Sequence, residues 1–414
     1  MSGRAAVSAP VAGMAPMPWV KLVAIAAALY CMAVNFSFVF AILPPIGRAL
    51  ALSELHVALV VSPAALVFVI GNGLWGPLVD RLGRKQVILS AVAATAAAAA
   101  LFGLIVQAGL DGLLQGVFLV ALMSLCRIGM AAFAGGFFPA SQAMVADITL
   151  PGQRVRSLAV IGTGFSLGMI TGPAVASAFS GFGIVVPFFA VAGLAGAVAL
   201  LVVLALPNTR ARRPAAGAPR QKTGFGQLWP FLAVTILVFS SYGILLQVTG
   251  FRLQDAFGMA PDEAARNSGW VLMATAGGLM GTQILMARLH LTTRQSASAM
   301  WIGALLALAA LAVLASVEAY LPVLLGMLLF GIGLGTAMPA ALGLLTVVAE
   351  AAGDQGRVAG LSGGAQGLGV VIGPLLGAVT YQNDPHLPYL AGIVMVALAA
   401  AVALLAAPQR LKLR

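Results

Sequence analysis

The sequence predicts an all-α polytopic membrane protein, and three observations carry this prediction. The chain of 414 residues is 61% hydrophobic and only 8% charged, whereas soluble domains carry about 25% charged residues. Its apolar residues form blocks of roughly 20, the length that a helix needs to cross a bilayer. Positions do not alternate between apolar and polar as they do in a membrane β-barrel. We therefore expect helices, whose backbone groups are all paired within lipid.

Twelve apolar blocks are predicted to cross the membrane. The first six are 19–44, 56–78, 86–107, 113–143, 157–179 and 184–206, and the second six are 228–251, 267–288, 297–316, 321–348, 358–381 and 387–407. The segment between the two sets is polar, and its charged residues are all basic. We expect residues 1–207 to form one six-helix bundle and residues 228–414 a second, with 208–227 as a cytoplasmic linker.

The positions of Lys and Arg predict the orientation. With the N-terminus inside, 18 of the 22 basic residues fall on the inner side and only Arg48, Arg252 and Arg266 on the outer side. This positive-inside bias places both termini in the cytoplasm. The alanine-rich composition favours a bacterial plasma (inner) membrane. The basic residues that give the net charge of +11 lie in short loops and form no basic domain, so nucleic acid is not an expected partner.

The two sets of six spans are internally related. An offset of 201 aligns glycines and a proline of the fifth span with those of the eleventh, and Gly135 and Pro139 in the fourth span align with Gly335 and Pro339 in the tenth. Such duplication is typical of transporter folds, which bind substrate between the repeats. Glycines spaced by four lie on one helix face and allow close packing. The expected packing residues are Gly164, Gly168, Gly172, Pro173, Gly369, Gly373 and Pro374.

The loop between the second and third spans carries the sharpest motif. Residues 76–85 read Gly-Pro-Leu-Val-Asp-Arg-Leu-Gly-Arg-Lys, with Gly76, Asp80, Arg81, Gly83 and Arg84 as its defining positions. This motif resembles the signature loop of the major facilitator superfamily. The resemblance implies that Asp80 helps to latch the two bundles together, partly at the N-terminus of the eleventh span near Arg357. A carboxylate at a helix N-terminus gains about 0.3–1 kcal/mol, which suits a latch that must reopen.

Arg127 is a charged residue in the middle of the fourth span. A charge at the bilayer centre costs about 2.5–3.5 kcal/mol, so Arg127 must face a cavity or a partner. Its placement resembles the fourth-helix Arg motif of exporters in the same superfamily, where the residue is associated with proton coupling. The run from Gly164 to Pro173 resembles the fifth-helix motif of the drug/proton antiporter branch. Together these motifs imply a major facilitator fold and the twelve-helix exporter branch.

The positions of the acidic residues do not identify the group that would couple transport to protons. All of them fall in loops or at span ends, and the first span carries Asn35 where many proton-coupled exporters have a carboxylate. Asp255 and Asp147 are the nearest substitutes. A cavity with Arg127 and no acid favours anionic or neutral substrates over cations. Expected coupling and cavity residues are Arg127, Asn35, Gln247, Gln283, Gln366 and Tyr242.

The predicted function is proton-coupled export of a drug-like compound or metabolite by a monomer. A facilitator or importer of a small organic acid is the alternative, and a non-transporting membrane sensor is a remote one. The sequence shows no catalytic pair at membrane depth and no metal-ligand spacing, so an enzyme, a metal and a cofactor are not expected. Cys31 and Cys126 fall within apolar blocks, which argues against a disulfide framework.

Overall fold

The computed structural model describes residues 17–150, 153–208, 225–289, 293–351 and 355–410. Within them the chain forms thirteen helices and no strand. The first bundle contains α1 (Trp19–Ala49), α2 (Glu54–Leu82), α3 (Arg84–Leu110), α4 (Gly116–Ala134), α5 (Phe137–Ile148), α6 (Arg154–Ser180) and α7 (Val186–Ala205). The second contains α8 (Phe225–Phe257), α9 (Pro261–Arg288), α10 (Thr293–Ser316), α11 (Tyr320–Ala351), α12 (Gln355–Asn383) and α13 (Leu387–Arg410).

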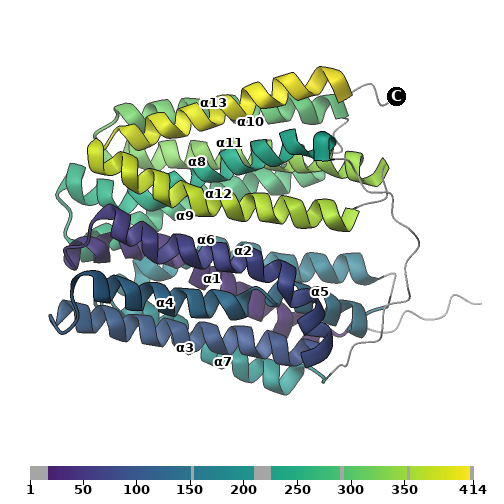
Figure 1. Cartoon of the computed structure of the whole chain (residues 1–414), viewed down its shortest axis with the longest axis horizontal. Coiled ribbons are helices and arrows are strands. Elements are labelled where there is room, and N and C mark those ends of the chain that lie inside the picture. The colour runs from purple at the N-terminus through teal and green to yellow at the C-terminus, as the bar shows by residue number, and fades with distance from the viewer. Residues whose placement is uncertain (1–16, 151–152, 209–224, 290–292, 352–354, 411–414) are drawn as a thin grey trace, which may run out of the picture.

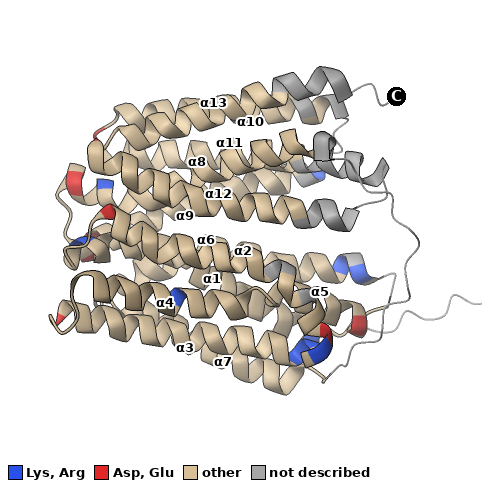
Figure 2. Cartoon of the chain, in the orientation of Figure 1, with Lys and Arg blue, Asp and Glu red and all other residues tan. Residues whose placement is uncertain are grey.

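The helices run up and down in two side-by-side bundles, α1–α7 and α8–α13 (Figure 1). Their charged residues gather at the two ends, and the length between the ends is almost free of them (Figure 2). We call the end at which α7 stops and α8 begins the linker end, and the other the opposite end. Most of the predicted linker falls outside the described residues.

The observed helices agree with the predicted spans. Among the described residues, eleven stretches are long and apolar enough to cross a membrane, and the shorter apolar helix Leu387–Ala403 lies at the place of the predicted twelfth span. One difference lies in the fourth span, which breaks into α4 and α5 at Gly135 and Gly136. The indole of Trp75 fills the break: its Nε1 donates a hydrogen bond of 2.7 Å to the Ala132 carbonyl. A Cβ on Gly136 would lie 2.6 Å from the same indole, so only glycine fits there.

Glycines allow one corresponding helix pair in each bundle to pack closely. Any Cβ on Gly164 or Gly168 would collide with the backbone of α1, and a Cβ on Gly172 would meet Ser37 and the Val34 carbonyl. In the second bundle Gly369 and Gly373 pack in the same way on α8. The two pairs, α1 with α6 and α8 with α12, are thus equivalent parts of the internal repeat.

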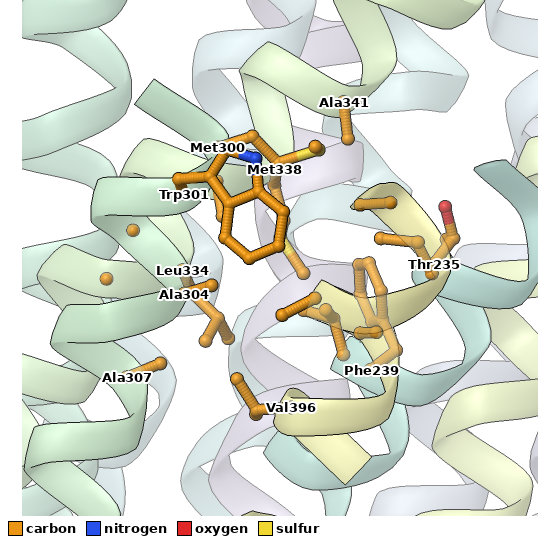
Figure 3. Close-up of a pocket in the computed structure, with 18 of the residues that line it drawn as sticks. Thr235, Phe239, Met300, Trp301, Ala304, Ala307, Leu334, Met338, Ala341 and Val396 are labelled. Atoms are coloured by element: carbon orange, nitrogen blue, oxygen red, sulfur yellow. The ribbon is translucent and has the colours of Figure 1, made fainter. Parts of the chain in front are cut away.

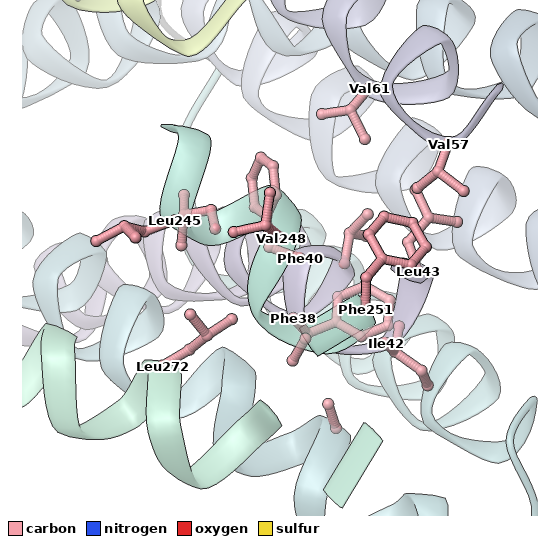
Figure 4. Close-up of a cluster of buried hydrophobic side chains, with 14 of the residues drawn as sticks. Phe38, Phe40, Ile42, Leu43, Val57, Val61, Leu245, Val248, Phe251 and Leu272 are labelled. Carbon is pink, nitrogen blue, oxygen red and sulfur yellow. The ribbon is translucent and has the colours of Figure 1, made fainter. Parts of the chain in front are cut away.

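An apolar cluster joins the two bundles at the opposite end. It contains Phe38, Leu43 and Val57 from the first bundle and Leu245, Phe251 and Leu272 from the second (Figure 4). We call these six residues the apolar seal; they are part of a larger apolar cluster that continues into both bundles. The described apolar clusters toward the linker end each stay within one bundle. The bundles are therefore closed against each other at the opposite end.

Candidate functional site

Four polar side chains from both bundles meet beside the apolar seal. Nη2 of Arg48, near the end of α1, lies 2.8 Å from Oδ2 of Asp255 in α8 and 2.6 Å from Oε1 of Glu54 in α2. The hydroxyl of Tyr381 in α12 donates to the same Asp255 oxygen at 3.0 Å. Residues more than 200 positions apart in the chain are thereby joined. We call Arg48, Glu54, Asp255 and Tyr381 the polar gate.

The polar gate contributes less to the free energy that holds the opposite end closed than the apolar seal does. The side chains of Arg48 and Asp255 are 35% and 40% exposed, and ion pairs this open contribute about 0–1 kcal/mol. The guanidinium of Arg48 also lies 5.2 Å from the centre of the Phe251 ring. Opening this end would expose the apolar seal to water, at a cost of about 1.5–3 kcal/mol for each fully buried large side chain. The seal therefore supplies most of the closing energy.

Arg127 lies inside the first bundle and has a protein partner. Its Nη1 donates a hydrogen bond of 3.0 Å to Oδ1 of Asn35 in α1. Both residues are buried. They line a small pocket between α1, α3, α4 and α7, with the rings of Phe38, Phe102 and Phe188 beside them. Two residues expected to act in coupling are therefore in direct contact.

The signature loop is held within the first bundle. Gly83 adopts φ of 94° between α2 and α3, which favours glycine. Arg84 is buried, and it forms ion pairs with Asp80 at 3.3 Å and with Asp147 of α5 at 3.2 Å. Gly76 lies in α2, and Arg81 is exposed in its last turn. Arg357 lies in the first turn of α12, but its side chain lies outside the described residues. The described contacts thus tie Asp80 to Arg84.

The remaining expected cavity residues do not form one cluster. Gln247 is buried in α8, and its Nε2 lies 3.5 Å from the backbone carbonyl of Glu54, beside the polar gate. Tyr242, one turn away, belongs to the large apolar cluster that contains the apolar seal. Gln283 is half-buried in α9. Gln366 lines an apolar pocket within the second bundle (Figure 3). These side chains therefore belong to three separate places.

Sequence reasoning did not identify the polar gate. Arg48 was one of only three basic residues on the predicted outer side, and Asp255 was noted as an acid near a span end. The position of Arg48 on the outer side, against the positive-inside bias, was the sequence feature that could have pointed to the polar gate. Nothing in the linear sequence places Arg48 next to Asp255 and Tyr381. Among the described residues, no group of three His, Cys, Asp or Glu side chains is placed to hold a metal.

Comparisons with known proteins indicate which family the chain is similar to. A family model described as the Major Facilitator Superfamily matches residues 23–360. Multidrug resistance protein 1 of Bacillus subtilis is 25% identical, over 93% of this chain and 96% of that protein. The class B tetracycline resistance protein of Escherichia coli is 26% identical, over 85% of this chain and 86% of that protein.

Solved structures share the fold. A bacterial homologue of the human lysosomal transporter Spinster, in an inward-facing and unoccupied conformation, superposes with a TM-score of 0.74. It is 17% identical, over 97% of this chain and 99% of that chain. The nucleoside transporter NupG superposes with a TM-score of 0.67 at 13% identity, over 94% of this chain and 98% of its own.

Proposed function

The chain belongs to the Major Facilitator Superfamily, and we propose that it exports a drug-like compound or metabolite in exchange for protons. It is a membrane transporter and not an enzyme. The observation that supports export is the similarity of the chain, over 85–93% of its length, to multidrug and tetracycline resistance proteins. A monomer provides both bundles and the interface between them, so we propose that the monomer is the working unit.

Alternating access follows from the two differently closed ends. The apolar seal and the polar gate hold the bundles together at the opposite end, while the apolar clusters toward the linker end stay within single bundles. The basic residues favour a cytoplasmic linker end. The described conformation would then face inward, ready to take substrate from the cytoplasm. Rocking one bundle against the other would open the opposite end to the outside.

Asp255 is our proposed proton-binding group. Asp147 faces only Arg84 in the first bundle, whereas Asp255 faces Arg48 and Tyr381 across the bundle interface. Glu54 is the other charged group on Arg48. Protonation of Asp255 from outside would remove its ion pair with Arg48 and leave Arg48 on Glu54. Outside protons would thereby favour opening of the opposite end, where an exporter must release its substrate.

Reconstituted protein tests the proposed function. Proteoliposomes carrying an imposed proton gradient should move a fluorescent uncharged compound against its own gradient, with counterflow of protons. Asp255→Asn should uncouple this movement, leaving only downhill flux, while Asp262→Asn, an exposed acid in α9, should behave as the wild type. Equal proton-driven flux in Asp255→Asn would exclude the coupling role.

The alternative is import of a small organic acid. The observation in its favour is Arg127, whose buried Nε has no hydrogen-bond partner among the described residues. The same proteoliposomes distinguish the two directions, since an importer would carry labelled carboxylates with the protons instead of against them. A non-transporting sensor would give no flux of either kind.

A further inference from the structure

The buried guanidinium of Arg127 has no counter-charge among the described residues. Every ion pair between described side chains involves Arg48 or Arg84 instead. The acidic residues that Figure 2 draws lie toward the two ends of the molecule, away from the middle of α4. A buried charge is costly unless an opposite charge lies close to it. The first bundle therefore contains a positive charge that its own described side chains do not neutralise.

Hydrogen bonding leaves free donors at the same place. Nη1 of Arg127 donates to Oδ1 of Asn35, while Nε is buried without a partner. Asn35 uses only its oxygen in this contact, and among the described contacts its NH2 group has no acceptor. The thiol of Cys126 donates to the Ala98 carbonyl at 3.4 Å, so it is neutral and supplies no negative charge. Free N–H groups around an unpaired cation are the chemistry of an anion site.

The pocket beside these donors has room for one small guest. It lies between α1, α3, α4 and α7, and Arg127 and Asn35 are the polar side chains of its lining. About 10 Å³ admits the centre of a water-sized sphere, within roughly 220 Å³ of space between atoms. This holds one guest close to the size of water, and it has no room for the carbon skeleton of an organic acid. Arg127 keeps 6% of its surface accessible, which leaves a small ion a way in.

We propose that a chloride ion occupies this pocket as the counter-ion of Arg127. Nε of Arg127 and the NH2 group of Asn35 donate to it. A water molecule suits the place less well, because it needs acceptors for its own hydrogens and the Asn35 oxygen already accepts from Arg127. The remaining walls, which include the rings of Phe102 and Phe188, are apolar, and attraction between opposite charges is little screened in such surroundings.

The chloride ion is a resident part of the first bundle and not its cargo. All four helices that line the pocket belong to that bundle, so the ion moves with it as one body. It also restores a negative charge in a span where Asn35 stands and no acid is present. The inference goes beyond the proposed function, because it holds for an exporter and an importer alike.

Thermal stability measures the binding. Purified full-length protein in detergent is titrated with sodium chloride, and sodium gluconate keeps the ionic strength constant. The melting temperature of the wild type should rise saturably with chloride, by roughly 2–4 °C at full occupancy. Bromide should act in the same way because it is of similar size. Equal melting temperatures in chloride and gluconate would overturn the proposal, and so would stabilisation by acetate as strong as that by chloride.

Asn35→Asp is the decisive variant. Its carboxylate supplies the negative charge covalently, so the melting temperature should no longer depend on chloride. The matched control is Asn383→Asp, which adds the same charge at an exposed position near the end of α12 and should respond to chloride as the wild type does. If Asn35→Asp is not recovered folded, Ala99→Val, which fills the pocket without changing its charge, must lose the response instead. A wild-type response in either folded variant overturns the proposal.

Bromide also locates the ion directly. Crystals of the wild type grown in bromide should give an anomalous peak between Arg127 and Asn35, and full occupancy of that place by water would contradict the site.

Proton-driven flux in proteoliposomes separates this inference from the proposed function. Driven export by a protein whose melting ignores chloride would leave the export function standing and remove the chloride site. A saturable chloride response without driven flux would leave the site standing and remove the export function.

Discussion

Arg127 makes a buried polar contact that the first bundle cannot replace. Its Nη1 donates to Asn35 at 3.0 Å, and both side chains are shielded from lipid. Arg127→Ala leaves the Asn35 amide without its partner, at a cost of about 1–3 kcal/mol, which corresponds to roughly five- to 150-fold in an equilibrium. We expect driven efflux to fall by about that factor in proteoliposomes.

The control for this prediction is Arg266→Ala, an exposed arginine of α9. It should transport at the wild-type rate. Arg127→Ala protein that elutes as a folded monomer and still exports normally would show that the arginine serves packing alone.

Arg48 is the residue that both acids of the polar gate share. Removing it places Glu54 and Asp255 near each other without a cation, so Arg48→Ala should weaken closure of the opposite end. A cysteine at Val57, buried in the apolar seal, reports this change. In Cys31→Ala, Cys126→Ala protein, Val57→Cys should react with a water-soluble maleimide several times faster when Arg48 is also alanine. An unchanged rate would mean that the seal alone keeps this end closed.

The polar gate also shows what the sequence could not predict at this scale. Charge at a span end is readable from composition, and the positive-inside bias made Arg48 an exception. The pairing of Arg48 with Asp255 depends on how two bundles dock, and no local pattern encodes that. The expected cavity residues failed to cluster for the same reason: Gln247 and Gln366 share a bundle but face different neighbours.

The helices themselves were predictable because bilayer thickness imposes their length. Each predicted span overlaps an observed one, with ends that extend by a few residues into the polar loops. The break between α4 and α5 was not predicted. The aligned segment of α11 passes Gly335 and Pro339 without a break, so the first glycine and the proline do not explain it, whereas Gly136 aligns with Thr336. The Trp75 indole that occupies the break comes from another helix.

The glycine ladder of α6 gives a prediction at the scale of one helix pair. A side chain on Gly168 would collide with the Tyr30 carbonyl and lie 2.7 Å from the Ala33 methyl. Overpacking typically costs about 1–3 kcal/mol, and rigid backbone raises the cost. Gly168→Val should therefore lower the melting temperature and the folded yield. Gly162→Val on the same helix, with nothing within 4 Å, is the matched control. Equal stability of the two variants would show that α1 can shift away.

At the scale of the whole molecule, function depends on an interface that must both hold and release. Glycines pack α6 on α1 and α12 on α8 inside each bundle, and a glycine contact with backbone, Gly269 of α9 against the Pro173 carbonyl of α6, crosses between the bundles. Across the bundles the opposite end is joined by side-chain contacts of the apolar seal and by partly exposed ion pairs. Rigid pairs inside each bundle and breakable contacts between them fit rocking of two solid bodies.

Cross-linking the bundles tests this motion. A Cβ on Gly367 of α12 would lie 3.3 Å from Cβ of Val69 in α2, close to the ~3.5–4.5 Å spacing of disulfides. In Cys31→Ala, Cys126→Ala protein, Val69→Cys with Gly367→Cys should form a disulfide under mild oxidation. Because the disulfide fixes α2 to α12, transport in proteoliposomes should stop on oxidation and return with dithiothreitol. Val69→Cys alone, and Gly367→Cys combined with Val69→Ala to make room for the new Cβ, should each transport in both conditions. Full transport by the cross-linked protein would mean that α2 and α12 move together, and substrate would then have to pass without the two bundles rocking apart at this contact.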